Sequence, residues 1–271
     1  MRSRLMAVAF GVLAVAVTAV GCDENEDTRV VDDAASAPAT AYSGPLSDSA
    51  ERALECESKV FSKGGADRWG EGDAGASPEE GLKLYFEIEQ PDVPRTGYRE
   101  ERREGDRVLY SLDADGRTKV AVIVAKGGEG RPGWGPESSA QCDPAELPES
   151  YTDSGPYEIW TDERGRRVPV TEVHSGEGAE HCDWQKAHVL STGWGKGGRL
   201  FARDPEGVLP PGSLTARYDG SARLPGDARD TGYRYGDWEL WLSDATPTKA
   251  YVRTPDGVEA WPATKEGFGC R

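Results

Sequence analysis

The sequence predicts an α+β fold in two disulfide-stapled domains. The first domain should lay helices on an antiparallel meander, and the second should be mostly antiparallel β. Three observations support this prediction: the even spacing of four cysteines, a capped helix start followed by strand-like runs, and a set of short motifs that occurs twice. The expected boundaries are 48–148 for the first domain and 149–271 for the second.

Four cysteines predict two intramolecular disulfide bonds. Cys56 and Cys142 are 86 positions apart, and Cys182 and Cys270 are 88 positions apart. The sequence has five cysteines, and setting Cys22 aside as the expected lipidation site leaves four. An even number of cysteines in an exported chain indicates pairing, and four cysteines allow three connectivities. The near-equal loop lengths favour pairing Cys56 with Cys142 and Cys182 with Cys270.

Helices are expected only in the first domain. A short helix over 50–60 would carry the first of these cysteines. Ser77 suits a helix N-cap, Pro78 suits the first helical position, and Glu80 is placed to complete a capping box. A second helix should therefore start at this point and stop before Pro91.

Strand patterns dominate the rest of both domains. In the first domain two β-rich runs flank Asp115-Gly116, a dipeptide typical of hairpin turns. In the second domain, 157–160 and 168–170 flank a turn at Gly165 and predict another hairpin. The other expected strands are 98–103, 107–112, 119–125, 187–191, 199–203, 238–242, 250–253 and 258–261.

One set of motifs occurs twice and indicates an internal duplication. Thr96-Gly97-Tyr98-Arg99 recurs as Thr231-Gly232-Tyr233-Arg234. Each copy is followed, in the same order, by an apolar run, a Thr-Lys pair, a second apolar run and a cysteine. Divergent duplication and chance similarity are both open as explanations.

The N-terminus predicts export. Arg2 and Arg4 precede an apolar run of 16 residues, 5–20, and Gly21 follows this run. This is the order of a secretory signal, and the run is shorter than the ~20 residues that a transmembrane helix needs. Cys22, directly after the expected cleavage site, resembles the lipobox of bacterial lipoproteins, whose cysteine receives a diacylglyceryl group with chains such as palmitate. Simple secretion is the alternative.

The expected organisation of the N-terminus is therefore a signal peptide over 1–21, then the lipidated cysteine and a tether over 22–47. The tether is rich in Ala, Ser, Pro and acidic residues and has too little apolar surface to offset its ordering entropy. The predicted location is the extracytoplasmic face of the cell membrane. The formal net charge of -16 excludes nucleic acid as a plausible partner, because such a surface repels phosphate.

The second half of the chain carries several motifs in a fixed order. They are His181-Cys182-Asp183-Trp184-Gln185, Arg203-Asp204-Pro205, Asp230-Thr231-Gly232-Tyr233-Arg234, Leu240-Trp241-Leu242, Trp261-Pro262 and Gly269-Cys270. This series resembles a group of uncharacterised lipoproteins and secreted proteins of high-GC Gram-positive bacteria. The abundance of Arg, Gly, Ala and Asp agrees with GC-rich coding. The group has no assigned activity, so the resemblance transfers no catalytic residue.

The three histidines suggest one candidate metal site. His174, His181 and His188 fall within a 15-residue stretch that also holds Cys182. Imidazole is an ordinary ligand of Zn and Cu, but the spacing matches no standard site, and a disulfide would remove the thiolate. Structural histidines are the favoured alternative, and no other cofactor is expected.

Catalytic motifs are absent from the sequence. There is no G-x-S-x-G elbow, S-x-x-K or H-E-x-x-H. A triad assembled from distant residues stays open, because such sites are recognised by geometry. The glycine-rich segment 193–198 lacks the spacing of a phosphate-binding loop and is expected to be a hairpin connection.

Tryptophans in the last strands suggest a binding surface. Trp238 and Trp241 are three positions apart on one expected strand, so they should face opposite sides of the sheet, and Trp261 lies on a later strand. An exposed aromatic platform for cell-wall glycan or an envelope protein is one hypothesis, and core aromatics are the alternative. The sequence as a whole favours a membrane-tethered, non-catalytic binding module of the cell envelope. An envelope hydrolase with a non-local site and a metal-binding lipoprotein are the alternatives.

Overall fold

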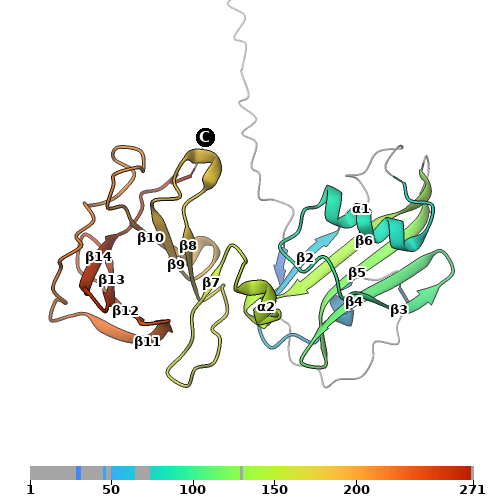
Figure 1. Cartoon of the computed structure of the whole chain (residues 1–271), viewed down its shortest axis with the longest axis horizontal. Coiled ribbons are helices and arrows are strands. Elements are labelled where there is room, and N and C mark those ends of the chain that lie inside the picture. The colour runs from blue at the N-terminus through green and yellow to red at the C-terminus, as the bar shows by residue number, and fades with distance from the viewer. Residues whose placement is uncertain (1–28, 32–44, 47–49, 65–73, 129–130, 270–271) are drawn as a thin grey trace, which may run out of the picture.

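The computed structural model describes residues 29–31, 45–46, 50–64, 74–128 and 131–269 (Figure 1). The predicted signal peptide, Cys22, most of the tether and Cys270 lie outside these residues. The described part is mostly antiparallel β with few helices. Figure 1 shows two lobes side by side, which we call the N-terminal lobe (described residues through 147) and the C-terminal lobe (156–269).

The N-terminal lobe is built on one six-stranded antiparallel sheet with strand order β1-β2-β6-β5-β4-β3. Helix α1 (Pro78–Ile88) packs on β5 and β6. The strands are β1 (Arg29–Val31), β2 (Val60–Gly64), β3 (Arg99–Glu104), β4 (Arg107–Ala114), β5 (Arg117–Gly128) and β6 (Arg131–Cys142).

Both faces of this sheet are covered. Val108 and Tyr110 of β4 pack with Phe86 of α1 in one core cluster, and the intervening Leu109 packs with Leu46 and other residues in a second cluster on the opposite face. Alternate side chains of a strand point to opposite faces, so a strand covered on both sides is apolar at every position. The continuous run 120–124 in β5, all buried, follows this rule.

The predicted helix at Ser77 is confirmed. Ser77 Oγ accepts a hydrogen bond from Glu80 N (3.3 Å), and Glu80 Oε2 accepts one from Ala76 N (2.6 Å). Both bonds satisfy backbone donors at the helix start. The helix ends at Ile88, before Pro91, as expected. The hairpin at Asp115-Gly116 is also confirmed, with positive φ at both residues and β4 paired to β5 on either side.

The predicted helix over 50–60 is wrong. Only a 3-10 turn, Ala50–Ala53, forms, and the chain then runs through a loop into β2. Backbone amides that would be hydrogen-bonded within a helix instead donate to other elements of the structure. Glu55 N donates to Thr118 O (2.9 Å), and the amides of Glu57 and Ser58 donate to the Glu146 carboxylate (2.8 and 2.9 Å). These tertiary bonds override a weak helical preference.

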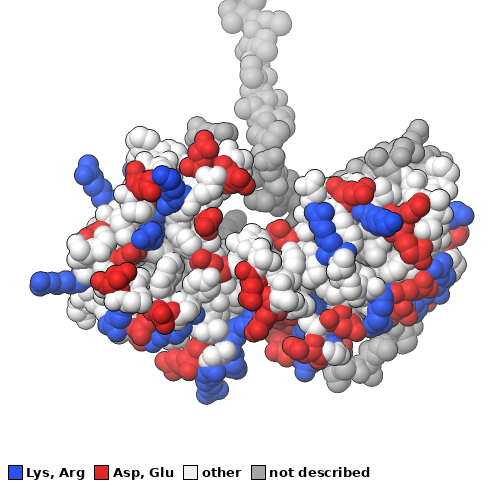
Figure 2. Space-filling model, viewed as in Figure 1, with Lys and Arg blue, Asp and Glu red and all other residues white. Residues whose placement is uncertain are grey.

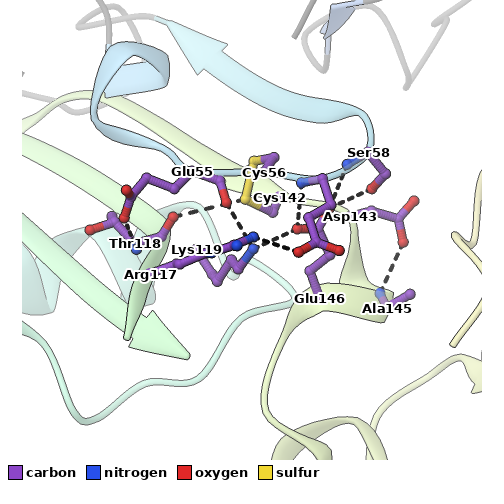
Figure 3. Close-up of a disulfide and its surroundings, with 11 residues drawn as sticks. Glu55, Cys56, Ser58, Arg117, Thr118, Lys119, Cys142, Asp143, Ala145 and Glu146 are labelled. Atoms are coloured by element: carbon purple, nitrogen blue, oxygen red, sulfur yellow. Dashed lines mark hydrogen bonds and ion pairs between the residues drawn. A yellow bond between two sulfur atoms is a disulfide. The ribbon is translucent and has the colours of Figure 1, made fainter. Parts of the chain in front are cut away.

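A disulfide fixes this loop to the end of β6. Cys56 and Cys142 are bonded, with Cα atoms 5.3 Å apart, which confirms one predicted staple. Beside it, Lys119 Nζ lies 2.7 Å from Glu146 Oε2 and 2.8 Å from Glu55 O (Figure 3). Cys182 is also disulfide-bonded. Its predicted partner Cys270 lies outside the described residues, so that pairing stays a prediction.

The C-terminal lobe contains two four-stranded antiparallel sheets, ordered β10-β9-β8-β7 and β11-β12-β13-β14. Their edges meet on both sides, because Thr161 forms a bridge with Arg234 and Phe201 forms one with Ala263. The eight strands thus enclose one core as a barrel. They are β7 (Glu158–Ile159), β8 (Val173–Glu177), β9 (His188–Thr192), β10 (Arg199–Arg203), β11 (Arg229–Tyr235), β12 (Trp238–Ser243), β13 (Lys249–Thr254) and β14 (Gly257–Pro262).

The structure corrects the first predicted hairpin of this lobe. The turn at Gly165 exists, with Val168 N donating to Trp160 O (2.8 Å), but the sheet partner of β7 is β8 rather than 168–170. Ser175 and Gly176 lie within β8. The five other predicted strands correspond to β9, β10, β12, β13 and β14.

The twice-occurring motifs lie on similar meanders. The first Thr-Gly-Tyr-Arg copy precedes and enters β3, and the second lies in β11. Each meander continues through three more antiparallel strands, β4-β5-β6 and β12-β13-β14. Gly97 and Gly232 both have positive φ, and Tyr98 and Tyr233 each pack against the core of their own lobe. The shared order agrees with duplication and equally with convergence on a common meander.

A short segment joins the lobes. Buried Asp143, just after β6, accepts hydrogen bonds from Ala145 N and from Val170 N across the junction (both 2.9 Å). Arg167 of the C-terminal lobe donates to Leu147 O (2.8 Å) and to Thr152 Oγ1 (2.6 Å) in α2 (Glu149–Thr152). Burial raises the pKa of Asp143, against the lowering effect of its hydrogen bonds. These contacts tie the two lobes together.

Candidate functional site

A cavity of about 290 Å³ lies between the lobes. The N-terminal lobe contributes residues of β2, β6 and the end of α1, and the C-terminal lobe contributes Tyr157, Val170 and Trp194. Ligand sites commonly occur in such interfaces and combine aromatic walls with a few polar groups. We call this cavity the inter-lobe groove.

Trp194 is the most conspicuous residue of the groove. Its side chain is 44% exposed, and its ring meets the Phe61 ring of the opposite lobe edge-to-face, with centroids 5.4 Å apart. The connection between β9 and β10 holds it there: Gly193 and Gly195 have positive φ, and Gly193 N donates to Glu172 O (2.7 Å). Glycine adopts this backbone freely, so a tight turn projects the indole away from the sheet.

The remaining lining is aromatic and polar. Tyr85 and Tyr157 add two more aromatic rings, and burial raises the pKa of both. The polar side chains belong to Ser62, Glu89, Gln90, Asp92, Ser139 and Gln141. Hydroxyl, amide and carboxylate groups at the rim of aromatic rings suit a ligand with both flat apolar faces and hydroxyl groups.

The three histidines do not form one site. His174 and His188 lie on adjacent strands, but the register of β8 and β9 places their side chains on opposite faces. His174 Nδ1 donates to Val170 O (2.7 Å), and burial lowers its pKa. His181 is exposed in the 3-10 turn Glu180–Cys182. Over the residues that the structure describes, no group of three or more potential ligands could hold a metal ion.

The three predicted binding tryptophans have different environments. Trp238 and Trp241 face opposite sides of β12, as expected: Trp238 packs against the barrel core, and Trp241 lies under Arg253, 5.0 Å from its guanidinium carbon. Trp261 is fully buried, so it cannot belong to a surface platform. The exposed aromatic is instead Trp194, which sequence reasoning placed in a connection. The sequence signal for this exposed residue was the position of Trp194 between Gly193 and Gly195 in a hairpin connection.

A second polar cluster lies inside the barrel. Trp160 Nε1 donates to Ser175 Oγ (2.9 Å), Ser175 Oγ donates to Glu158 Oε2 (2.5 Å), and His188 Nε2 donates to the same oxygen (2.6 Å). The residue types match a serine triad, but the serine bonds the carboxylate instead of the imidazole. Ser175 is also only 1% exposed, so it is not placed as a nucleophile.

Comparisons with protein-family models, curated proteins and solved structures find no match to this chain. The resemblance to lipoproteins and secreted proteins of high-GC Gram-positive bacteria therefore stays a prediction from the motifs alone. Among the described helices, none has the length and apolar character needed to span a bilayer.

Proposed function

We propose that the protein is a lipid-anchored, extracytoplasmic binding module of the cell envelope. Its ligand is a segment of cell-wall glycan that occupies the inter-lobe groove. The anchor is Cys22, which lies seven positions before β1, an edge strand of the N-terminal lobe.

The exposed indole of Trp194, positioned over a cavity that both lobes line, carries this proposal. A concave site with aromatic walls and a few convergent polar groups is the usual form of a small-ligand site. The groove is concave and small, which suits a chain of sugar rings better than the broad, flat surface of a protein partner. Its aromatic rings offer faces for sugar C–H groups, and the hydroxyl and amide groups of Ser62, Ser139 and Gln141 match sugar hydroxyls.

An envelope hydrolase has less support. The serine of the barrel cluster is buried and bonded to a carboxylate. Figure 2 shows acidic and basic residues interspersed over the visible face of both lobes.

Calorimetric titration of the mature chain with soluble N-acetylglucosamine oligosaccharides and with glycan fragments of digested cell wall tests the groove. Trp194→Ala should weaken binding at least tenfold, because central aromatic anchors carry most of the energy of an interface. Leu200→Ala is the matched control: Leu200 is also a large exposed apolar residue (37%) but does not line the groove, so its loss should leave affinity unchanged. Equal affinity of wild type and Trp194→Ala would refute the assignment.

A further inference from the structure

The polar chain inside the barrel ends at two side chains that lie close to the surface. Glu158 and His188 are 23% and 15% exposed, at the end of the barrel where β7 begins and β9 starts. Their partners Ser175 and Trp160 are fully enclosed. The Glu158–His188 pair therefore marks the boundary between the packed core and one mouth of the barrel, which is a common place for ligand sites.

Aromatic rings surround this pair. The His188 ring meets Trp238 and Trp261 edge-to-face, with centroids 5.6 and 5.7 Å apart. Tyr235 lies 5.9 Å from Trp238 and 6.0 Å from Trp160. Trp160 and Trp261 form the buried floor, and the partly exposed Tyr235 and Trp238 form the outer wall. We call this arrangement the barrel-end box.

Two polar atoms in the box face solvent and make no hydrogen bond to another protein group among the described residues. Within the part of the chain that the structure describes, Glu158 Oε1 and His188 Nδ1 make no hydrogen bond, whereas Glu158 Oε2 accepts two. Neither atom is among the fully enclosed unpaired polar atoms, so both reach solvent. Glu158 therefore presents one carboxylate oxygen to solvent near Tyr235.

The electrostatics of the box favour a positive ligand. Burial raises the pKa of Tyr235, and the negative charge of Glu158 raises it further, so the field of the carboxylate reaches the outer wall. Arg203, the cross-strand partner of His188, is held by Glu259 (2.9 Å). Aromatic faces beside a carboxylate attract ammonium groups through cation–π and ion-pair interactions.

We propose that the barrel-end box binds a small organic cation, an alkyl- or methyl-substituted ammonium, with its charge against Glu158 and its carbon substituents against Tyr235 and Trp238. This site is separate from the inter-lobe groove and does not depend on the function proposed for it. The ligand is recognised by charge and size, so a neutral molecule of the same shape should be rejected.

The test compares choline with 3,3-dimethylbutan-1-ol, its neutral isostere, by calorimetric titration of the mature chain. Choline should bind saturably, and the isostere should bind at least tenfold more weakly. Equal binding of the two compounds, or no saturable binding of choline at millimolar concentration, would overturn the proposal without any mutant.

Two matched variants locate the site. Glu158→Gln keeps the shape and an acceptor for His188 and Ser175 but removes the charge, so choline affinity should fall at least tenfold. Trp238→Leu should have a similar effect, whereas Trp241→Leu, on the opposite face of the same strand, should not. Wild-type affinity for choline in folded Glu158→Gln and Trp238→Leu would refute the assignment, as would an equal loss in Trp241→Leu.

Discussion

The buried ion pair between Lys119 and Glu146 makes a quantitative prediction about stability (Figure 3). The two side chains are only 6% and 12% exposed. Lys119→Met removes the charge at nearly constant volume. Glu146 keeps three donors, the amides of Glu57 and Ser58 and the Ser58 hydroxyl, while Glu55 O loses its lysine donor.

The expected loss of unfolding free energy depends on the interactions that the remaining charged group keeps. Removing one partner of a buried pair costs about 3 to 5 kcal/mol, because the other charge is left uncompensated. The three remaining donors place Lys119→Met at the lower end, about 3 kcal/mol. Glu146→Gln leaves the lysine with one neutral acceptor and should cost a similar amount. The double variant should cost about 2 kcal/mol less than the sum, because it leaves no unpaired charge.

The pH dependence gives an independent check. Burial raises the pKa of Glu146, but its bonds to Lys119, Ser58 and Glu57 lower that pKa by a larger amount. The net pKa therefore lies below the ordinary value of 4.5. The stability from this group is therefore present above pH 4.5 and lost as the pH falls through the folded-state pKa. The difference between wild type and Lys119→Met should shrink in that acidic range.

Urea unfolding of the disulfide-intact chain measures all four proteins of the cycle at neutral and acidic pH. Single variants that each cost under about 1 kcal/mol, the range of surface pairs, would refute the assignment of a structural ion pair. Strict additivity of the two substitutions would refute the coupling.

Two further predictions concern the cysteines. Cys56→Ala/Cys142→Ala should lower the free energy of unfolding by about 4 to 5 kcal/mol, from the loop entropy of an 86-residue separation, and a loss under about 1 kcal/mol in urea unfolding would contradict this. The wild-type chain, expressed in a bacterium that processes lipoproteins, should fractionate with membranes and carry a diacylglyceryl mass on Cys22, whereas Cys22→Ala should be soluble; an unacylated wild-type chain in the culture medium would instead indicate simple secretion.

Strong local signals were sufficient for part of the fold. The cap at Ser77 and the Asp115-Gly116 turn each specify their structure through a few hydrogen bonds or a backbone preference, and both are found. Strand-like runs likewise predicted five barrel strands. The disulfide between Cys56 and Cys142 followed from the spacing of the cysteines together with the predicted export.

Two of the strands that were not predicted, β6 and β8, have sequences that do not look like strands. β6 contains Gly133, Gly135 and Pro136, and it forms because β2 and β5 flank it, with a register shift at Val124 opposite Pro136. β8 contains Gly176, where a Cβ would meet Pro156 O at 2.7 Å, so the close approach of another backbone requires glycine there. Tertiary pairing decided both strands, and a single sequence does not contain that information.

The candidate sites depend on the same long-range information. Glu158 and His188 are 30 positions apart, and Phe61 and Trp194 lie in different lobes. Sequence reasoning selected tryptophans because they lie on strands, but strand tryptophans such as Trp261 are drawn into the barrel core. Trp194 is exposed because it lies in the turn between β9 and β10, where its side chain does not face the barrel core.

The segment that follows β6 links these observations. Within a few residues, Cys142 bonds the loop before β2, Asp143 holds the backbone before β8, and Glu146 binds Lys119 and the same loop. Leu147 then accepts from Arg167 of the barrel. One short stretch thus fixes β2, which carries Phe61, relative to the C-terminal lobe, which carries Trp194. A groove held in this way is preformed, so a ligand would bind it with little loss of conformational freedom.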